Sequence, residues 1–360
     1  MERVYNFSAG PAVIDESVLK QAADELFCYP GKGMSVLEMS HRTPMFMDIY
    51  NEAIALFREV MGVPEGYEVL FLHGGATMQF SAVPLNLLTG SKVADYLDTG
   101  NFAHLAAEEA KKYGTVNIVA SSKADNYTYI PDLAKVAFTP DADYVHITTN
   151  NTIYGTRYVE LPDTGAVPLV ADMSSNILSE PMDVSRFGAI YAGAQKNIGP
   201  AGLCVLVVRK DLLGKASPVC PKIIDWAQQA KNESMINTPN TFAIYMVKLV
   251  CEWMKREGGV AAFKARNEAK AKLLYDAIDA SRLFKNPVQP KYRSLMNVTF
   301  VTGDEAKDDA FCKYCAKNDL ANIKGHRNVG GMRASIYNAM PLAGVQKLVD
   351  AMAQFEKENL

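Results

Sequence analysis

The chain of 360 residues has little cysteine and no long apolar segment, and each shortage excludes a class of protein. Its six cysteines are scattered rather than grouped as in a small disulfide-rich secreted domain, so we expect a reducing, cytoplasmic setting. No apolar run approaches the roughly 18 residues typical of a membrane helix, and the N-terminus lacks the apolar core of a signal peptide. The formal net charge of −3 gives no sign of binding to nucleic acid or to an anionic membrane.

Metal-ligand motifs are also scarce. Cys312 and Cys315 have the spacing of half a zinc site, but no second pair with matching spacing accompanies them. Residues 304–316 have the pattern of an amphipathic helix, on which these two thiols lie one turn apart. We therefore interpret them as core-facing neighbours and expect no metal site.

The sequence is rich in short apolar runs, which alternate with helical patterns from about residue 68 onward. Near-continuous apolar runs separated by helices indicate an α/β fold, with a mostly parallel sheet covered by helices on both faces. Little helix separates the last runs before residue 209, so antiparallel pairing is possible there. We expect a large domain over residues 16–257 and a smaller α+β domain over residues 258–360, joined by the N-terminal segment 1–15.

Three features follow predicted strands, where ligands bind in open α/β sheets. Residues 74–77, Gly-Gly-Ala-Thr, connect a strand to a helix, and their backbone N–H groups suit an anion. Asp172 ends the buried run VPLVAD, where a carboxylate needs a cation or several hydrogen bonds. Lys196 lies among small residues after a later run, where burial lowers a lysine pKa and favours the neutral, nucleophilic amine.

Each feature alone also has an ordinary structural explanation. The glycines fit a tight turn, Asp172 fits a helix cap or a bond to Ser174 or Ser175, and Lys196 fits a solvated hairpin. Together, however, a phosphate cradle, a buried acid and a lysine at one sheet edge match the needs of pyridoxal 5'-phosphate. That cofactor uses a phosphate anchor, an acid facing its ring nitrogen and a lysine that forms a Schiff base.

Loops that carry arginine suggest an anionic substrate. His41-Arg42, His326-Arg327 and Arg333 lie in stretches flanked by serine or glycine. The planar guanidinium group suits bidentate recognition of carboxylate and phosphate. These loops therefore predict binding of a doubly charged anion, although surface ion pairs would explain any single arginine.

Several segments closely resemble the phosphoserine aminotransferase family of class V aminotransferases, which have pyridoxal phosphate fold type I. They occur in order through the whole chain and are NFSAGPA, EMSHR, LHGGATMQF, ADMSSNILS, YAGAQKNIGPAGL, NTPNTF and KGHRNVGGMRASIYNAMP. The resemblance implies a homodimer with active sites at the interface. It also implies reversible transamination between L-glutamate and 3-phosphohydroxypyruvate, giving 2-oxoglutarate and O-phospho-L-serine in serine biosynthesis. A second reaction, on 4-phosphohydroxythreonine in vitamin B6 (pyridoxine) synthesis, is implied as well.

The resemblance also implies roles for individual residues. Lys196 would bind the cofactor as a Schiff base and move the proton between substrate and cofactor carbons, and Asp172 would face the pyridine nitrogen. The other residues expected to bind the cofactor are Ala76 and Thr77 at the phosphate, Phe102, Thr152 and Gln195 near the ring, and Asn237 and Thr238 from the other subunit. The residues expected to bind substrate are Arg333 at the α-carboxylate and His41, Arg42, His326 and Arg327 at the phosphate or distal carboxylate.

Two positions depart from the family pattern. Phe102 stands where many relatives have tryptophan, and Thr77 stands where some bacterial relatives have arginine.

Two other functions compete with an aminotransferase. One is a cysteine desulfurase or a lyase on the same fold, but a desulfurase needs a thiol on a mobile loop, and Cys312 and Cys315 lie in a helical pattern. A non-enzymatic binding protein is another, but it would not need the lysine, the aspartate and the cradle together.

Overall fold

A seven-stranded sheet dominates the computed structural model, which describes residues 3–360. The strands, in spatial order, are β2 (Tyr67–His73), β10 (Leu203–Arg209), β9 (Ala189–Gly193), β8 (Leu169–Asp172), β5 (Tyr144–Thr148), β3 (Val93–Asp98) and β4 (Thr115–Ser121). β10 is antiparallel to both β2 and β9, and the other neighbouring strands are parallel. The predicted mostly parallel sheet is confirmed, and its antiparallel portion lies at β10.

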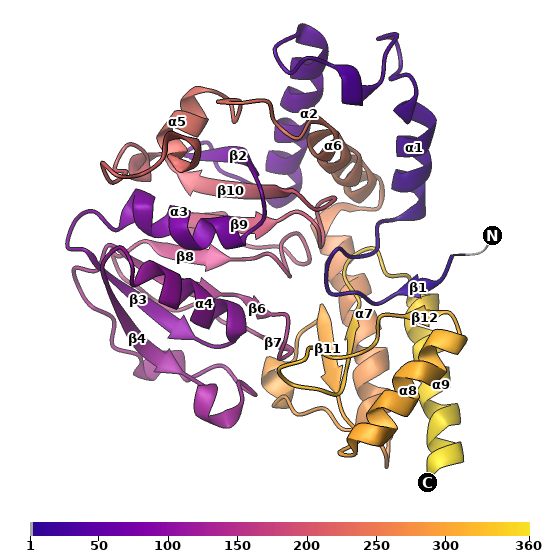
Figure 1. The fold of residues 1–360 in the computed structure, drawn as a ribbon. Coiled ribbons are helices and arrows are strands. Elements are labelled where there is room, and N and C mark those ends of the chain that lie inside the picture. The colour runs from indigo at the N-terminus through magenta and orange to yellow at the C-terminus, as the bar shows by residue number, and fades with distance from the viewer. Residues whose placement is uncertain (1–2) are drawn as a thin grey trace.

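Helices cover both faces of this sheet (Figure 1). The helices on one face are α2 (Pro44–Met61) and α6 (Thr241–Arg256), with α1 (Glu16–Leu26) beside α6. Those on the other face are α3 (Thr77–Leu87), α4 (Asn101–Ala110) and α5 (Trp226–Lys231). Because side chains alternate along a strand, Val69 and Phe71 belong to the first core and Leu70 and Leu72 to the second. The sheet is therefore buried on both sides, as its near-continuous apolar runs predicted.

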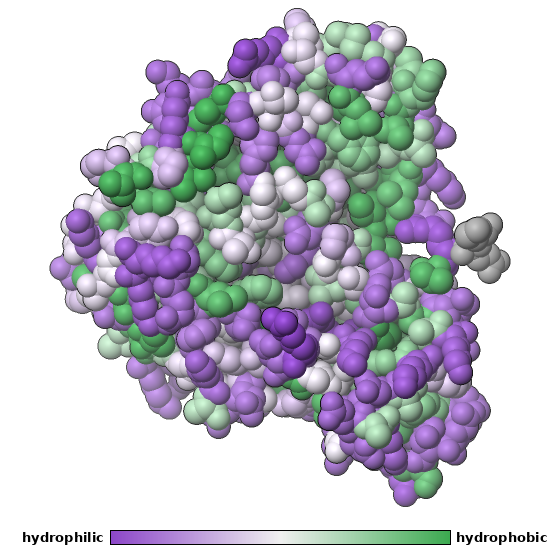
Figure 2. All heavy atoms as spheres, in the orientation of Figure 1, coloured by the Kyte–Doolittle hydropathy of each residue, from purple (hydrophilic) through white to green (hydrophobic). Residues whose placement is uncertain are grey.

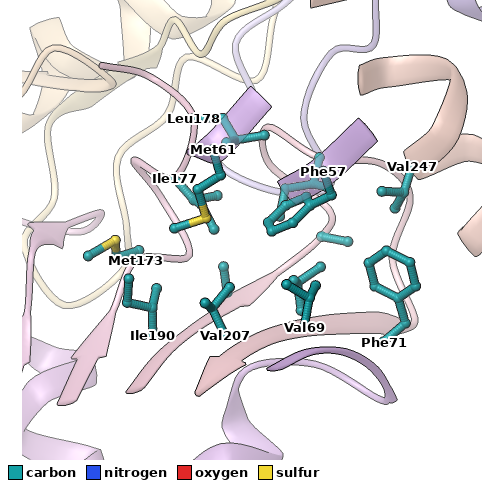
Figure 3. Packing of buried hydrophobic residues seen from close by; sticks show 14 of the residues in the cluster. Phe57, Met61, Val69, Phe71, Met173, Ile177, Leu178, Ile190, Val207 and Val247 are labelled. Carbon is teal, nitrogen blue, oxygen red and sulfur yellow. The ribbon is translucent and has the colours of Figure 1, made fainter. Parts of the chain in front are cut away.

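The packing of α2 shows how local sequence fixes one of these layers. The helix begins at Pro44, which suits a first helical position, and ends at Met61, followed by Gly62, whose left-handed φ of 69° closes the last turn. Phe57 and Met61 are four residues apart and so share one face of the helix. Figure 3 shows both side chains directed at the sheet, toward Val69 and Val207.

The C-terminal part of the chain has a separate hydrophobic core, which extends from Ala271 to Phe355 and includes Phe7, whereas Phe263 packs in the core beside the main sheet. Its elements are α7 (Gly259–Ala280), β11 (Asn297–Phe300), α8 (Glu305–Lys317), β12 (Leu320–Ala321), β13 (Met332–Ser335) and α9 (Leu342–Asn359). The short strand β1 (Tyr5–Asn6) pairs with β12, so the N-terminal segment crosses to this part (Figure 1). Cys315 on α8 is buried and Cys312 is half-buried, so the amphipathic helix predicted there is present.

Two further strands form a small hairpin beside the main sheet, β6 (Asn150–Asn151) and β7 (Thr156–Arg157). Among the helices of residues 3–360, none combines the length and the apolar character required to cross a bilayer.

We predict that Phe57→Ala destabilises the fold by about 3–5 kcal/mol, because it leaves a cavity between α2 and the sheet where Phe57 is fully buried. Urea unfolding followed by circular dichroism measures the loss. Leu105→Ala on α4 is the control: that side chain is 46% exposed, so the change in unfolding free energy should stay within about 0.5 kcal/mol. Equal effects of the two substitutions would contradict the packing described for α2.

Candidate active site

A cavity of about 250 Å³ opens at the carboxyl ends of β5 and β8. Its walls also include the turn after β9, the first turns of α3 and α4, and residues of the C-terminal part. The residues expected from the sequence that the cavity brings together are Ala76, Thr77, Phe102, Thr152, Asp172, Gln195, Lys196, His326 and Arg333. Groups from both halves of the chain therefore meet at the sheet edge where a ligand was predicted.

Lys196 lies in the connection between β9 and β10, which is a hairpin as the alternative interpretation proposed. The side chain nevertheless lines the cavity, where its Nζ donates to Thr152 Oγ1 at 3.1 Å. Nζ also lies 5.7 Å from the centroid of the Phe102 ring. Burial lowers the pKa of Lys196 to about 8, partly opposed by the carboxylate of Asp172. Near neutral pH the neutral, nucleophilic amine is therefore more populated than in a lysine exposed to water.

Asp172 is the last residue of β8 and is buried in the cavity wall. Its Oδ1 accepts a hydrogen bond from the backbone N–H of Ser174 at 2.9 Å, which is one of the bonds that the ordinary explanation predicted. Burial raises the pKa of Asp172, because the carboxylate loses its hydration. A cationic group placed in the cavity would reverse this effect and hold the carboxylate in its charged form.

The turn from β2 to α3 presents backbone donors to the same cavity. Gly74 adopts a left-handed φ of 83°, which lets the strand turn sharply into the helix. Gly75, Ala76 and Thr77 all line the cavity. No side chain of residues 3–360 caps the N-terminus of α3, and the first turn of α3 contains no acidic residue. The exposed N–H groups and the helix dipole make it suitable for a phosphate group.

Arg333 on β13 brings a cation from the C-terminal part into the cavity. Its Nη1 donates to the backbone oxygen of Thr152 at 3.2 Å, whereas its Nε is buried and finds no acceptor among the described residues. His326 lies nearby in the cavity wall and is half-buried. Since Asp172 is the sole acidic residue among the described residues of the lining, the cavity favours an anionic ligand.

Five of the expected residues do not line this cavity: His41, Arg42, Asn237, Thr238 and Arg327. Four of them are exposed, and His41 is buried with an Nε2 that has no partner within the described chain. The two His-Arg pairs look equivalent in the sequence, but only His326 reaches the cavity.

Several polar residues of the cavity were not among those predicted to bind cofactor or substrate. They are Thr148, Asn150, Ser174 and Ser175. Thr148 ends β5 just as Asp172 ends β8, so the rule that ligands bind after strand ends could have found it. Its Oγ1 is buried and lacks a partner among residues 3–360, which leaves a hydrogen-bonding group available to a ligand.

The donors of the cavity fit pyridoxal phosphate. The uncapped end of α3 suits its phosphate, the neutral amine of Lys196 suits its aldehyde, and the buried Asp172 suits its ring nitrogen. The unpartnered Oγ1 of Thr148 provides a further polar contact. No cysteine is among the described lining residues, so the cavity lacks the thiol of a desulfurase. The fold and the site together define a pyridoxal-phosphate-dependent enzyme of fold type I.

Comparison with known proteins identifies the family. A family model of aminotransferase class V matches residues 4–348. The phosphoserine aminotransferase of Bacillus cereus is 53% identical over the full length of both chains, and that of Listeria innocua is 54% identical over 99% of this chain and 97% of its own. The chain belongs to the class V aminotransferases and is a pyridoxal-phosphate-dependent aminotransferase.

Solved structures agree with this assignment. The phosphoserine aminotransferase of Bacillus circulans subsp. alkalophilus superposes with a TM-score of 0.98 at 43% identity, with both chains fully covered. A pyridoxal-phosphate-bound phosphoserine aminotransferase from Trichomonas vaginalis gives a TM-score of 0.94 at 41% identity, covering 98% of this chain and 100% of its own.

The depressed pKa of Lys196 makes a prediction that needs no cofactor. In the cofactor-free protein, the acetylation rate of Lys196 should rise with pH and level off above about 8, since only the neutral amine reacts. Asp172→Asn should move this midpoint lower, because the lost carboxylate stabilised the ammonium form. Peptide mass spectrometry measures the rates, with the exposed Lys20 as the internal control. A midpoint for Lys196 equal to that for Lys20 would contradict its burial.

Proposed function

We propose that this aminotransferase transfers an amino group reversibly between L-glutamate and 3-phosphohydroxypyruvate, giving 2-oxoglutarate and O-phospho-L-serine in serine biosynthesis. The observation that carries the proposal is the cavity in which Lys196, Asp172 and Arg333 meet. It is supported by the identity of 53% to a phosphoserine aminotransferase over the full chain. The cationic character of the cavity suits substrates that carry a carboxylate and a second anionic group.

The proposed catalytic roles follow from the positions of two side chains. When bound, pyridoxal phosphate supplies an electron sink for the substrate's α-carbon. Lys196 Nζ would take the proton from that carbon and deliver it to a carbon of the cofactor, which requires an amine that is neutral part of the time. The Asp172 carboxylate would hold a proton on the ring nitrogen through a charge-assisted hydrogen bond. Thr152 Oγ1, 3.1 Å from Nζ, would orient the amine.

The remaining cavity residues would bind and orient. Ala76 and Thr77 would donate backbone N–H groups to the cofactor phosphate at the start of α3. Phe102 would cover one face of the ring, and Gln195 would lie near it. Arg333 would bind the substrate α-carboxylate through its guanidinium group. His326, with the adjacent Arg327, would approach the distal anion from the C-terminal part.

We further propose that the enzyme is a homodimer in which each subunit completes the site of the other. His41 and Arg42 would reach the distal anion of the partner's site, and Asn237 and Thr238 the phosphate of its cofactor, because none of the four lines the cavity of its own chain. Figure 2 shows apolar surface on the side where Figure 1 places α1 and α6. The segment of residues 27–43, which contains His41 and Arg42, connects α1 to α2. Phe27 and Leu37 in this segment are 92% and 60% exposed, a cost that a dimer interface would remove.

Three broader proposals accompany this function. The separate core of the C-terminal part supports a division into a large domain over residues 16–257 and a small domain over residues 258–360, joined by the N-terminal segment 1–15, of which residues 5–6 pair with β12. The same phosphate recognition would serve 4-phosphohydroxythreonine in vitamin B6 synthesis. The six unpaired cysteines suit a cytoplasmic setting.

The visible absorption spectrum tests the reaction directly. L-phosphoserine should abolish the yellow band of the cofactor bound to Lys196, whereas L-serine should do so poorly because it lacks the phosphate. Lys196→Ala should lack the lysine-bound band and lose nearly all turnover, by a factor of at least about 100. A band indifferent to phosphoserine would leave the cofactor assignment standing and refute the substrate.

Subunit complementation tests the proposed dimer. Arg42→Ala should bind cofactor normally but bind phosphoserine weakly, and Lys196→Ala should be inactive. After the two variants are unfolded and refolded together, half of the dimers are mixed and each mixed dimer has one intact site, so about a quarter of wild-type activity should return. Each variant refolded alone is the control. If the mixture is no more active than the Arg42→Ala control, Arg42 acts in its own subunit or not at all.

A further inference from the structure

Three buried asparagine side chains hold three consecutive carbonyl groups in the loop after Asp172. The bonds are Asn197 Nδ2 to Ile177 O at 2.9 Å, Asn338 Nδ2 to Leu178 O at 2.9 Å, and Asn267 Nδ2 to Ser179 O at 3.1 Å. The asparagines come from the turn that carries Lys196, from the stretch after β13 and from α7. We call these three residues the asparagine cluster.

The loop that the cluster holds has a strained backbone. Leu178 has a φ of 58°, in the left-handed region that side chains with a Cβ rarely adopt. Such a conformation persists where its surroundings determine it, and the side chain of Leu178 is also buried in the core shown in Figure 3. The asparagine cluster supplies directed bonds on both sides of the strained residue, which packing alone does not provide.

The cluster is also connected within itself. The backbone N–H of Asn338 donates to Asn197 Oδ1 at 3.0 Å, and Asn267 Nδ2 donates to Asn338 Oδ1 at 2.8 Å. One turn further along α7, the buried Lys270 Nζ donates to the carbonyl oxygens of residues 336 and 337 at 2.8 and 2.6 Å. Asn338 is thus the central member, because it bonds to both other asparagines and to the strained loop.

Three of the four segments that meet at the cluster also carry a charged group of the active site, and the fourth is α7. Asn197 follows Lys196 directly, Asn338 lies five residues after Arg333, and Leu178 lies six residues after Asp172. We propose that Asn338 is a positioning residue that fixes Arg333 in the C-terminal part relative to Lys196 and Asp172 in the sheet. This inference deepens the proposed function, since it rests on the roles proposed there for Lys196 and Arg333.

Hydrogen exchange of the cofactor-loaded protein tests the physical coupling without any substrate. The amides to follow are those of Ile177, in the loop after Asp172, and Gly199, in the turn that carries Lys196; each bonds to a backbone carbonyl of its own segment. In Asn338→Ala both amides should exchange about tenfold faster, because the lost bonds leave buried groups unpaired. Asn86→Ala is the matched control: Asn86 is also buried and bonded to backbone at both ends, but it is outside the cavity and the cluster. Unchanged exchange, or an equal rise in the control, would overturn the proposal.

Kinetics test the consequence for the reaction. The single-turnover rate of Asn338→Ala at saturating L-phosphoserine should fall about 100-fold, because a displacement of about 1 Å between reacting groups has an effect of that size. The visible band of the Lys196-bound cofactor should remain, and Asn86→Ala should keep the wild-type rate. A full rate in Asn338→Ala would overturn the inference even if its melting temperature falls.

Two further measurements keep the result unambiguous. Asn338→Asp retains the acceptor for Asn267 but loses the donor for Leu178, so it should match Asn338→Ala and replaces it if the alanine variant does not fold. If the wild-type enzyme does not react with L-phosphoserine, the proposed substrate is wrong. The same variants are then compared with L-glutamate as the amino donor, where a full rate in Asn338→Asp would again overturn the positioning role.

Discussion

The parallel pairing of β5, β8 and β9 is the constraint on which the whole site depends. In the observed register Thr148 pairs with Asp172, and Asp172 pairs with Tyr191, so these three residues form one row across the sheet. Since side chains alternate along a strand, a slip of one residue in β8 would turn the Asp172 carboxylate to the opposite face. The same register brings the end of β9, and therefore Lys196, next to the loop after Asp172. The nearly continuous apolar runs of these strands thus do more than form a core, because their burial on both faces determines where the chemistry occurs.

Burial acts in opposite directions on the two central ionisable groups. It lowers the pKa of Lys196 and raises that of Asp172, because each loses the hydration of its charged form. Each group partly offsets the effect on the other through the attraction of opposite charges. The cavity therefore holds both groups closer to neutrality than water would, and a cationic ring nitrogen beside Asp172 would restore the charge of the carboxylate. The buried Asp172 would thus become fully charged only when a cationic partner lies beside it, so it avoids a permanent unpaired charge.

Local sequence patterns predicted the parts of the site that follow strands, and they failed where distant segments meet. Lys196, Asp172 and residues 74–77 were found from their places after apolar runs, and Thr148 was available by the same rule. Thr152 and Gln195 came only from family resemblance, because the bond from Lys196 to Thr152 depends on the fold of the β6–β7 hairpin. The bond from Asn338 to Leu178 spans 160 residues and leaves no periodic signal. The left-handed backbone of Leu178 is likewise invisible in the sequence, since leucine gives no hint of it.

The two departures from the family pattern place different demands on the enzyme. Phe102 keeps an aromatic face beside Lys196, so the surface available for stacking is smaller but of the same kind. Thr77 has no charge, so the start of α3 offers an anion only neutral donors, its backbone N–H groups and the Thr77 hydroxyl. In the proposed dimer, anion binding would therefore depend more on the His-Arg pairs, of which the partner subunit would supply His41 and Arg42. Substrate affinity would then be linked to subunit association, because a protomer alone retains Lys196 and Asp172 but loses part of its anion site.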